Sequence, residues 1–185
     1  FLLDYHINRL AGSAAYFGFS FDEAHIRETL DSLLSEREND HCRIRLVLHR
    51  DGRVSLQHGP LLGNVHGGPQ LVRLAREPVS EGNRFLYHKT TRRVVYDNAM
   101  QSVTDCDDVL LWNSQGFVTE TTIANVVVEI GGRRVTPPVS CGLLGGTYRQ
   151  WLLDRGEIEE WPIHLYDIHN IDRFTLINSV RGQWA

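Results

Sequence analysis

The spacing of apolar residues changes at Cys42, and this change most limits the folds open to the chain. Before that point, apolar positions between about residues 4 and 34 recur every three or four residues, as in amphipathic helices. From Cys42 to Leu56, apolar and polar residues largely alternate, and the Asp51-Gly52 pair favours a hairpin turn. The sequence therefore predicts helices followed by a β-hairpin, within a mixed α/β chain of the α+β type.

A loop-like stretch with proline and glycine, residues 78–83, is the best candidate for a boundary between two subdomains. We expect a small α/β subdomain over residues 1–80 and a larger one over residues 81–185. Within the small part, Ser20 and Glu23 form a capping-box pattern that predicts the start of a helix. In the larger part, we expect helices over residues 92–101 and 147–153, and strands over residues 109–112, 123–130, 133–136, 158–165 and 174–180.

The composition argues against several classes of protein. A net charge of −4 and a pI near 6.1, with no basic stripe, disfavour nucleic acid as a partner. No apolar run approaches the ~18 residues of a membrane helix. The three cysteines show no metal-ligand spacing, and the nine histidines form no cluster. We therefore expect a cytoplasmic protein with reduced thiols, no metal site and no membrane contact.

Lys89 stands on the edge of the apolar run Phe85–Tyr87, which has the character of a strand leading into a helix. Ordinarily such a lysine lays its stem on apolar surface and keeps its ammonium in water. A partly buried lysine instead has a lowered pKa, so its amine can act as a nucleophile and then as a base. Two later segments favour this second interpretation, because they supply the other groups that pyridoxal phosphate needs.

Glu120 lies at the mouth of an apolar strand, where a carboxylate could keep the pyridine nitrogen of that cofactor protonated. The ordinary interpretation is a solvated residue of a turn. Further on, Leu144-Gly145-Gly146-Thr147 leads directly into a helix, and backbone amides with a hydroxyl at a helix N-terminus bind phosphate. Taken alone, that segment is also an ordinary strand-to-helix turn.

Polar residues near the two ends of the chain add to this pattern. Arg9 lies on a predicted helix and is either a bidentate cation for the phosphate or a surface residue. Asn178 and Ser179 close the apolar strand Thr175–Ile177, at a strand end where functional sites tend to form. The sequence matches neither a P-loop nor a Gly-x-Ser-x-Gly elbow. Pyridoxal phosphate is thus the cofactor that the pattern predicts.

Together, these segments resemble the class IV (fold type IV) pyridoxal-phosphate enzymes. That family includes branched-chain aminotransferases, D-amino-acid aminotransferases and 4-amino-4-deoxychorismate lyases, and the resemblance runs from His6 to Gly182. It implies that Lys89 forms the Schiff base with the cofactor and that Glu120 contacts the pyridine nitrogen. The other positions that match the family's cofactor-binding pattern are Arg9, Asn125, Leu144, Gly145, Gly146, Thr147, Asn178 and Ser179.

The resemblance also implies an architecture. Family members have two subdomains with the cofactor in the cleft between them, which in this chain would lie near residues 80–84. They form dimers, so a homodimer is expected. The strands that normally precede the helix with Arg9 are absent from this sequence, and its abrupt start fits a segment of a longer, fused polypeptide.

Within the family, the sequence is most similar to the 4-amino-4-deoxychorismate lyases, above all to those fused behind the chorismate-using component of para-aminobenzoate synthase. The segments His88–Arg93, Pro137–Leu144 and Ile177–Gly182 carry this similarity. It implies the conversion of 4-amino-4-deoxychorismate to 4-aminobenzoate and pyruvate, a step of folate biosynthesis, with Lys89 as the acid–base group.

Two alternatives stay open. A class IV aminotransferase acting on branched-chain or D-amino acids would share Lys89 and Glu120. It would also need an arginine for the α-carboxylate of its substrate, and Arg73, Arg76 and Arg181 are equal candidates. The other alternative is a degenerate domain that binds no cofactor and only supports a fused synthase.

Overall fold

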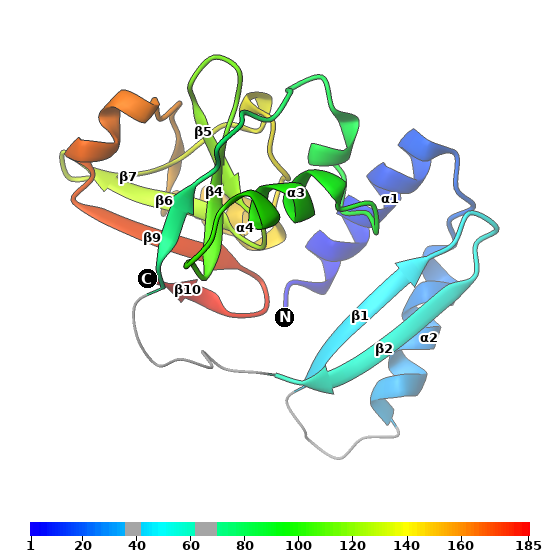
Figure 1. The fold of residues 1–185 in the computed structure, drawn as a ribbon. Coiled ribbons are helices and arrows are strands. Elements are labelled where there is room, and N and C mark those ends of the chain that lie inside the picture. The colour runs from blue at the N-terminus through cyan, green and yellow to red at the C-terminus, as the bar shows by residue number, and fades with distance from the viewer. Residues whose placement is uncertain (36–41, 62–69) are drawn as a thin grey trace. The chain divides into compact units, whose positions relative to one another are not determined.

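The computed structural model describes residues 1–35, 42–61 and 70–185. Helices and strands are interspersed along these ranges (Figure 1), so the predicted mixed α/β fold class is confirmed. None of the helices in the described ranges has the length and apolar character needed to cross a membrane.

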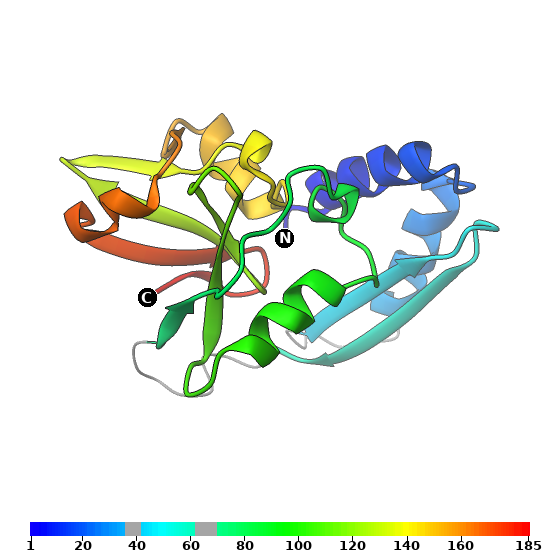
Figure 2. The ribbon, with the colours of Figure 1, turned by 45° about the horizontal axis from the view of Figure 1, so that its top comes forward.

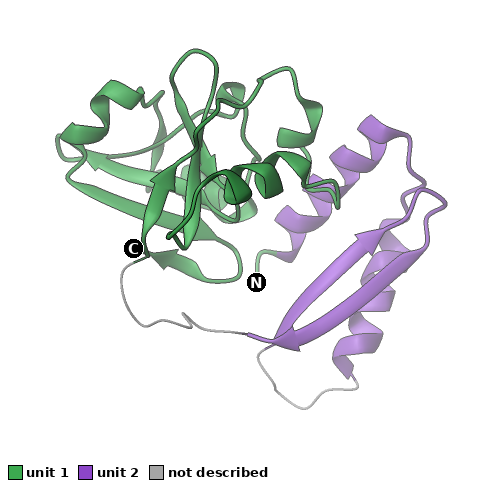
Figure 3. Ribbon diagram, in the orientation of Figure 1, with its two compact units in different colours: residues 1–2, 66–185 green, residues 3–65 purple. Residues whose placement is uncertain are grey.

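Contacts between Cα atoms divide the chain into two compact units, residues 3–65 and residues 1–2 with 66–185 (Figure 3). This division lies between residues 65 and 66, whereas the sequence prediction put the boundary after residue 80. The reason is that the strand Val72–Leu74 pairs with a strand of the larger unit.

The smaller unit packs two helices against an antiparallel hairpin. Buried Ile7, Ile26 and Leu30 form its core, together with partly buried apolar residues of the two strands. The predicted helices and hairpin are confirmed, and Gly52 of the Asp51-Gly52 turn has a φ of +90°, which favours glycine. The elements are α1 (Leu3–Phe17), α2 (Glu23–Ser35), β1 (Cys42–Leu48) and β2 (Val54–Pro60).

The larger unit is built on one sheet with the strand order β10-β9-β6-β5-β4-β3, and β7 lies between β6 and β8 (Figures 1 and 2). The Trp184 indole donates a hydrogen bond to the Gln70 side chain at 2.8 Å, so the sheet curls and its two edges approach each other. The strands are β3 (Val72–Leu74), β4 (Asp108–Trp112), β5 (Val118–Thr121), β6 (Asn125–Ile130), β7 (Arg133–Thr136), β8 (Glu159–Glu160), β9 (Arg173–Asn178) and β10 (Gly182–Trp184). The helices are α3 (Val94–Ser102) and α4 (Thr147–Asp154), with short 3₁₀ turns η1 (Arg84–Leu86), η2 (Val139–Cys141) and η3 (Leu165–Asn170).

Apolar side chains cover both faces of this sheet. Leu110, Val126 and Leu176 belong to a core cluster on one face. The side chains that alternate with them point the other way, where α3 packs through Tyr96 and α4 packs through Leu152. The central strands β4, β5 and β6 are consequently in the interior, and any polar side chain on them must find partners there.

The segment that carries Lys89 differs from its prediction. The preceding apolar run is not a strand, because residues 84–86 form the 3₁₀ turn η1. The side chain of Asn83 caps this turn by accepting a hydrogen bond from the Phe85 amide at 3.1 Å. Lys89 therefore lies in irregular backbone between η1 and α3.

Two predicted strands are also corrected. Residues 158–165 form the two-residue strand β8 and an isolated bridge between His164 and Phe117, and Pro162 between them has no amide N–H for a continuous strand ladder. The strand predicted over residues 123–130 begins at Asn125, and a separate buried strand, β5, precedes it. The second correction places Glu120 inside a strand.

Candidate active site

Glu120 is held on a tight connection between β5 and β6. The Thr121 amide donates to the Ala124 carbonyl at 2.8 Å, which turns the chain so that Glu120 pairs with Asn125 across the two strands. Asp108 stabilises the same turn, because its Oδ1 accepts hydrogen bonds from the amide and the hydroxyl of Thr122, at 3.1 and 2.6 Å. The backbone around Glu120 is therefore fixed from two sides.

The carboxylate of Glu120 is only 4% exposed and has three hydrogen-bond donors. Its Oε1 accepts from the Tyr96 hydroxyl at 2.8 Å and from the Leu144 amide at 3.1 Å. Its Oε2 accepts from Asn125 Nδ2 at 3.2 Å. The interpretation of Glu120 as a solvated turn residue is wrong, since burying a carboxylate in this way requires partners that are specific to it.

Burial raises the pKa of Glu120 to about 7. The hydrogen bonds from Tyr96 and Leu144 oppose this rise, and so do the nearby positive charges of Lys89 and Arg93. Burial also raises the pKa of Tyr96, and the Glu120 carboxylate raises it further. Tyr96 thus stays protonated and remains a donor over the pH range in which Glu120 titrates.

The predicted phosphate turn lies directly against this network. Asn125 Nδ2 donates to the Leu144 carbonyl at 2.8 Å as well as to Glu120. Gly146, the residue before α4, comes so close to Asn125 that a Cβ at this position would overlap the amide oxygen Oδ1. The glycine is required by this close approach rather than by its φ of −67°. A turn without side-chain bulk at a helix N-terminus fits a phosphate.

Lys89 is the only lysine of the chain, beside eighteen arginines. Its side chain is exposed, which corrects the expectation of partial burial, and its charge acts on Glu120. The segment after it is fastened to the β5–β6 connection, because the Arg93 guanidinium donates to the Thr122 carbonyl at 2.6 Å. The only side-chain amine of this 185-residue sequence is thus accessible and within electrostatic range of the buried carboxylate.

The remaining predicted positions have different surroundings. Asn178 Oδ1 accepts from the amides of Val180 and Arg181, both at 2.9 Å, and its Nδ2 donates to the Ile123 carbonyl at 3.3 Å. Asn178 therefore shapes the turn after β9 and joins it to the turn after Glu120, and half-buried Ser179 follows it. Arg9 lies on α1 in the smaller unit and is half-buried. That these residues help to bind the phosphate stays a prediction.

Sequence reasoning missed three residues that support Glu120: Tyr96, Arg93 and Asp108. The sequence placed Tyr96 on a predicted helix and left open whether it touches the cofactor ring, because periodicity cannot show where its hydroxyl points. Asp108 opens the buried strand β4, and a carboxylate at such a position was a signal that could have been followed.

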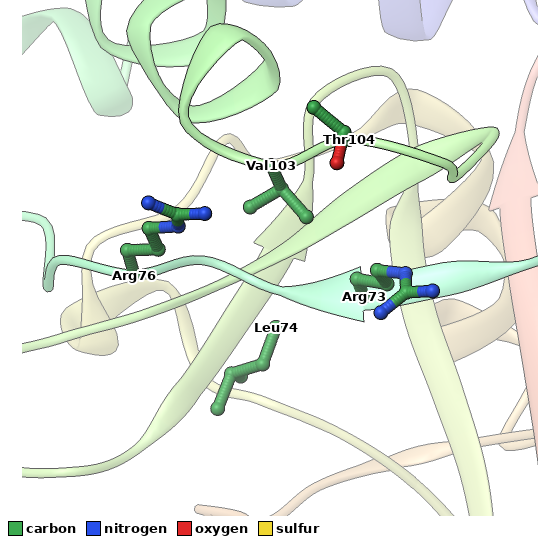
Figure 4. A pocket seen from close by; sticks show the side chains of 5 residues that line it. All are labelled: Arg73, Leu74, Arg76, Val103 and Thr104. Carbon is green, nitrogen blue, oxygen red and sulfur yellow. The ribbon is translucent and has the colours of Figure 1, made fainter.

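A cavity of about 360 Å³ lies elsewhere on the larger unit (Figure 4). It is lined by Arg73, Leu74 and Arg76 from β3 and the residues after it, and by Val103 and Thr104 after α3. The guanidinium groups of the two arginines lie at opposite ends of this lining rather than converging. None of the predicted cofactor residues lines the cavity.

The fold is that of the class IV aminotransferases. A solved structure of an amino-acid aminotransferase, provisionally assigned, from Mesorhizobium loti superposes with a TM-score of 0.90 at 36% identity, over 99% of this chain and 89% of that one. The sequence profile of the amino-transferase class IV family matches residues 1–185, and the chain belongs to this family.

Lyases of the family are similar as well. A Schizosaccharomyces pombe protein, provisionally assigned as an aminodeoxychorismate lyase, is 35% identical over 190 residues, which span 98% of this chain and 81% of that protein. The structure of 4-amino-4-deoxychorismate lyase from Pseudomonas aeruginosa has a TM-score of 0.78 over 99% of this chain and 76% of that one. At 19% identity, this last similarity concerns the fold alone.

Proposed function

We propose that this chain is a pyridoxal-phosphate-dependent lyase that converts 4-amino-4-deoxychorismate to 4-aminobenzoate and pyruvate. The buried Glu120 carboxylate, which is held by three donors beside the turn that opens α4, carries the cofactor part of the proposal. The 35% identity to the S. pombe lyase relative supports the lyase reaction. When bound, pyridoxal phosphate supplies an electron sink that stabilises negative charge on the substrate carbon next to the amine.

We assign a role in this reaction to Glu120, Gly146 and Lys89. Glu120 takes the pyridine nitrogen as a further partner of its carboxylate, while Gly146 keeps the turn before α4 open to the phosphate. Lys89 would hold the cofactor and would be released when the substrate amine binds. Its Nζ then accepts the proton from the ring carbon that bears the amine. The same group donates a proton as the enolpyruvyl ether bond breaks and pyruvate leaves, and the ring becomes aromatic.

The proposal extends to the assembly of the protein. The family resemblance supports a homodimer. The similarity to fused lyases supports a partnership, covalent or not, with a chorismate-using synthase component that provides the amine substrate.

A second candidate is a class IV aminotransferase acting on branched-chain or D-amino acids. The Mesorhizobium loti structure favours it, because that aminotransferase is 36% identical to this chain and the S. pombe lyase relative is 35% identical. The two reactions share Lys89 and Glu120 and differ in their products.

The test joins a chemical tag to a product assay. Reduction with borohydride in the presence of pyridoxal phosphate should attach the cofactor to one side chain, Lys89, since no other side-chain amine exists in the chain. With enzymatically made aminodeoxychorismate, the wild type should release 4-aminobenzoate and pyruvate in equal amounts, and Lys89→Ala should release neither.

The outcomes separate the candidates. A tag on Lys89 with amino-group transfer to a keto acid, and no 4-aminobenzoate, would replace the lyase by the aminotransferase. A tag only on the N-terminal α-amine, or no tag, would refute both.

A further inference from the structure

Tyr96 donates to the carboxylate at the centre of the site, although it belongs to α3 rather than to the strands. We propose that Tyr96 is a positioning residue that occupies Glu120 Oε1 and so presents Oε2 to the ring nitrogen of the cofactor. This inference rests on the proposed function, because it concerns how Glu120 meets the bound cofactor.

The two oxygens of Glu120 are not equivalent. Oε1 accepts two hydrogen bonds, from Tyr96 at 2.8 Å and from the Leu144 amide at 3.1 Å. Oε2 accepts the longer bond from Asn125, at 3.2 Å. A carboxylate oxygen has room for two donors, so Oε2 is the atom that can take another one.

The Tyr96 ring cannot readily turn its hydroxyl elsewhere. The residue is 8% exposed and packs in a core cluster with Leu86, Val109 and Leu111. The Arg93 guanidinium lies 4.8 Å from the centre of its ring and donates to the Thr122 carbonyl. The ring is thus held between a cation and the core, and its hydroxyl meets Glu120 in a fixed direction.

The same contacts connect the segment that carries Lys89 with the carboxylate of Glu120. The connection from Lys89 to α3 ends at Arg93, and Tyr96 lies in the first turn of the helix that follows. The positive charges of Lys89 and Arg93 both lower the pKa of Glu120.

The experiment compares Tyr96→Phe with the wild type, using pyridoxal phosphate and its 1-deaza analogue, in which C–H replaces the ring nitrogen. Tyr96→Phe should weaken binding of pyridoxal phosphate about tenfold, since a hydrogen bond to a charged group is lost, and leave binding of the analogue unchanged. The matched control is Tyr87→Phe, which removes a hydroxyl that donates to the Glu81 carbonyl at 2.7 Å instead. This control should change neither affinity.

A second measurement needs no cofactor. The carboxyl ¹³C signal of Glu120, assigned with Glu120→Gln, should titrate near pH 7 in the wild-type protein. Its midpoint should move upward in Tyr96→Phe, because the ionised form loses a donor.

Equal loss of affinity for both ligands, or no loss for either, would overturn the inference, as would an unchanged Glu120 midpoint. Failure of the wild type to bind pyridoxal phosphate would overturn the proposed function and, with it, the part assigned to Oε2. In that case the titration would still report whether Tyr96 acts on Glu120, so the two failures are distinguishable.

Discussion

The β5–β6 connection and the segment around Lys89 contribute to one candidate site in opposite ways. Glu120 is buried and held by three donors, and Asp108 and Thr122 brace the turn next to it. Lys89 is exposed and follows a 3₁₀ turn in irregular backbone. The carboxylate is fixed before any ligand arrives, whereas the amine lies where a substrate or cofactor can reach it.

This difference fits what the proposed function requires of each group. A carboxylate that only holds a ring nitrogen gains from rigid placement, since preorganised partners need no rearrangement on binding. A lysine that exchanges partners and carries protons needs freedom of its four-carbon stem. We therefore expect changes at the connection to alter stability, and changes at Lys89 to alter chemistry alone.

The largest expected effect is a pH dependence of stability that originates at Glu120. Its pKa is about 7 in the folded chain against an ordinary value of 4.5, so the folded state retains a proton that the unfolded state releases. Its contribution to stability is present below pH 4.5 and is lost, by about 3 kcal/mol, as the pH rises through 7.

Urea unfolding of the ligand-free protein at several pH values, beside Glu120→Gln, measures this contribution. The free energy of unfolding of the wild type should fall relative to that of the variant between pH 4.5 and 8. Parallel pH curves for the two proteins would show that Glu120 does not titrate in this range.

A smaller effect is expected at the glycine turn. Gly146→Ala should cost about 1–3 kcal/mol, because the new methyl group overlaps Asn125 Oδ1 and forces a shift in the network. Gly145→Ala is the matched control, since its methyl group would meet only Val139 Cγ2, at 3.9 Å. Thermal unfolding of the two variants should separate them, and equal stability would contradict the close approach seen at Gly146.

The smallest effect on stability is expected at Lys89. Lys89→Ala should change the free energy of unfolding by no more than about 0.5 kcal/mol, as is usual for an exposed side chain, although it removes the cofactor tag. Lys89→Arg keeps the positive charge and should likewise fold normally without a tag. Marked destabilisation of Lys89→Arg would mean that the two regions are not as different as their contacts suggest.

Periodicity predicted the elements whose burial follows a simple pattern. The helices and hairpin of the smaller unit are examples, and so is α4 with Gly156 after its end, at a φ of +67°. The cap of α2 was misassigned to Ser20, because the His25 amide donates to Asp22 instead. Neighbouring polar residues compete for a cap, and the sequence does not rank them.

The candidate site was predicted in part. Spacing and resemblance pointed to Glu120, Asn125 and the Leu144–Thr147 turn, and the hydrogen bonds join these three. The strand character of residues 118–121 was missed, because Thr119 and Thr121 are polar residues that pack as buried strand residues. Contacts from α3 to Glu120 depend on tertiary packing, which no local pattern encodes.

The contact between Asn125 and Gly146 has a consequence for how relatives of this chain can diverge. Asn125 simultaneously serves Glu120 and the Leu144 carbonyl and fills the space that a side chain at position 146 would need. A larger residue at 146 favours a smaller one at 125, which would leave Glu120 short of a donor. We therefore expect a relative with a side chain at position 146 to lack this amide donor to its buried carboxylate.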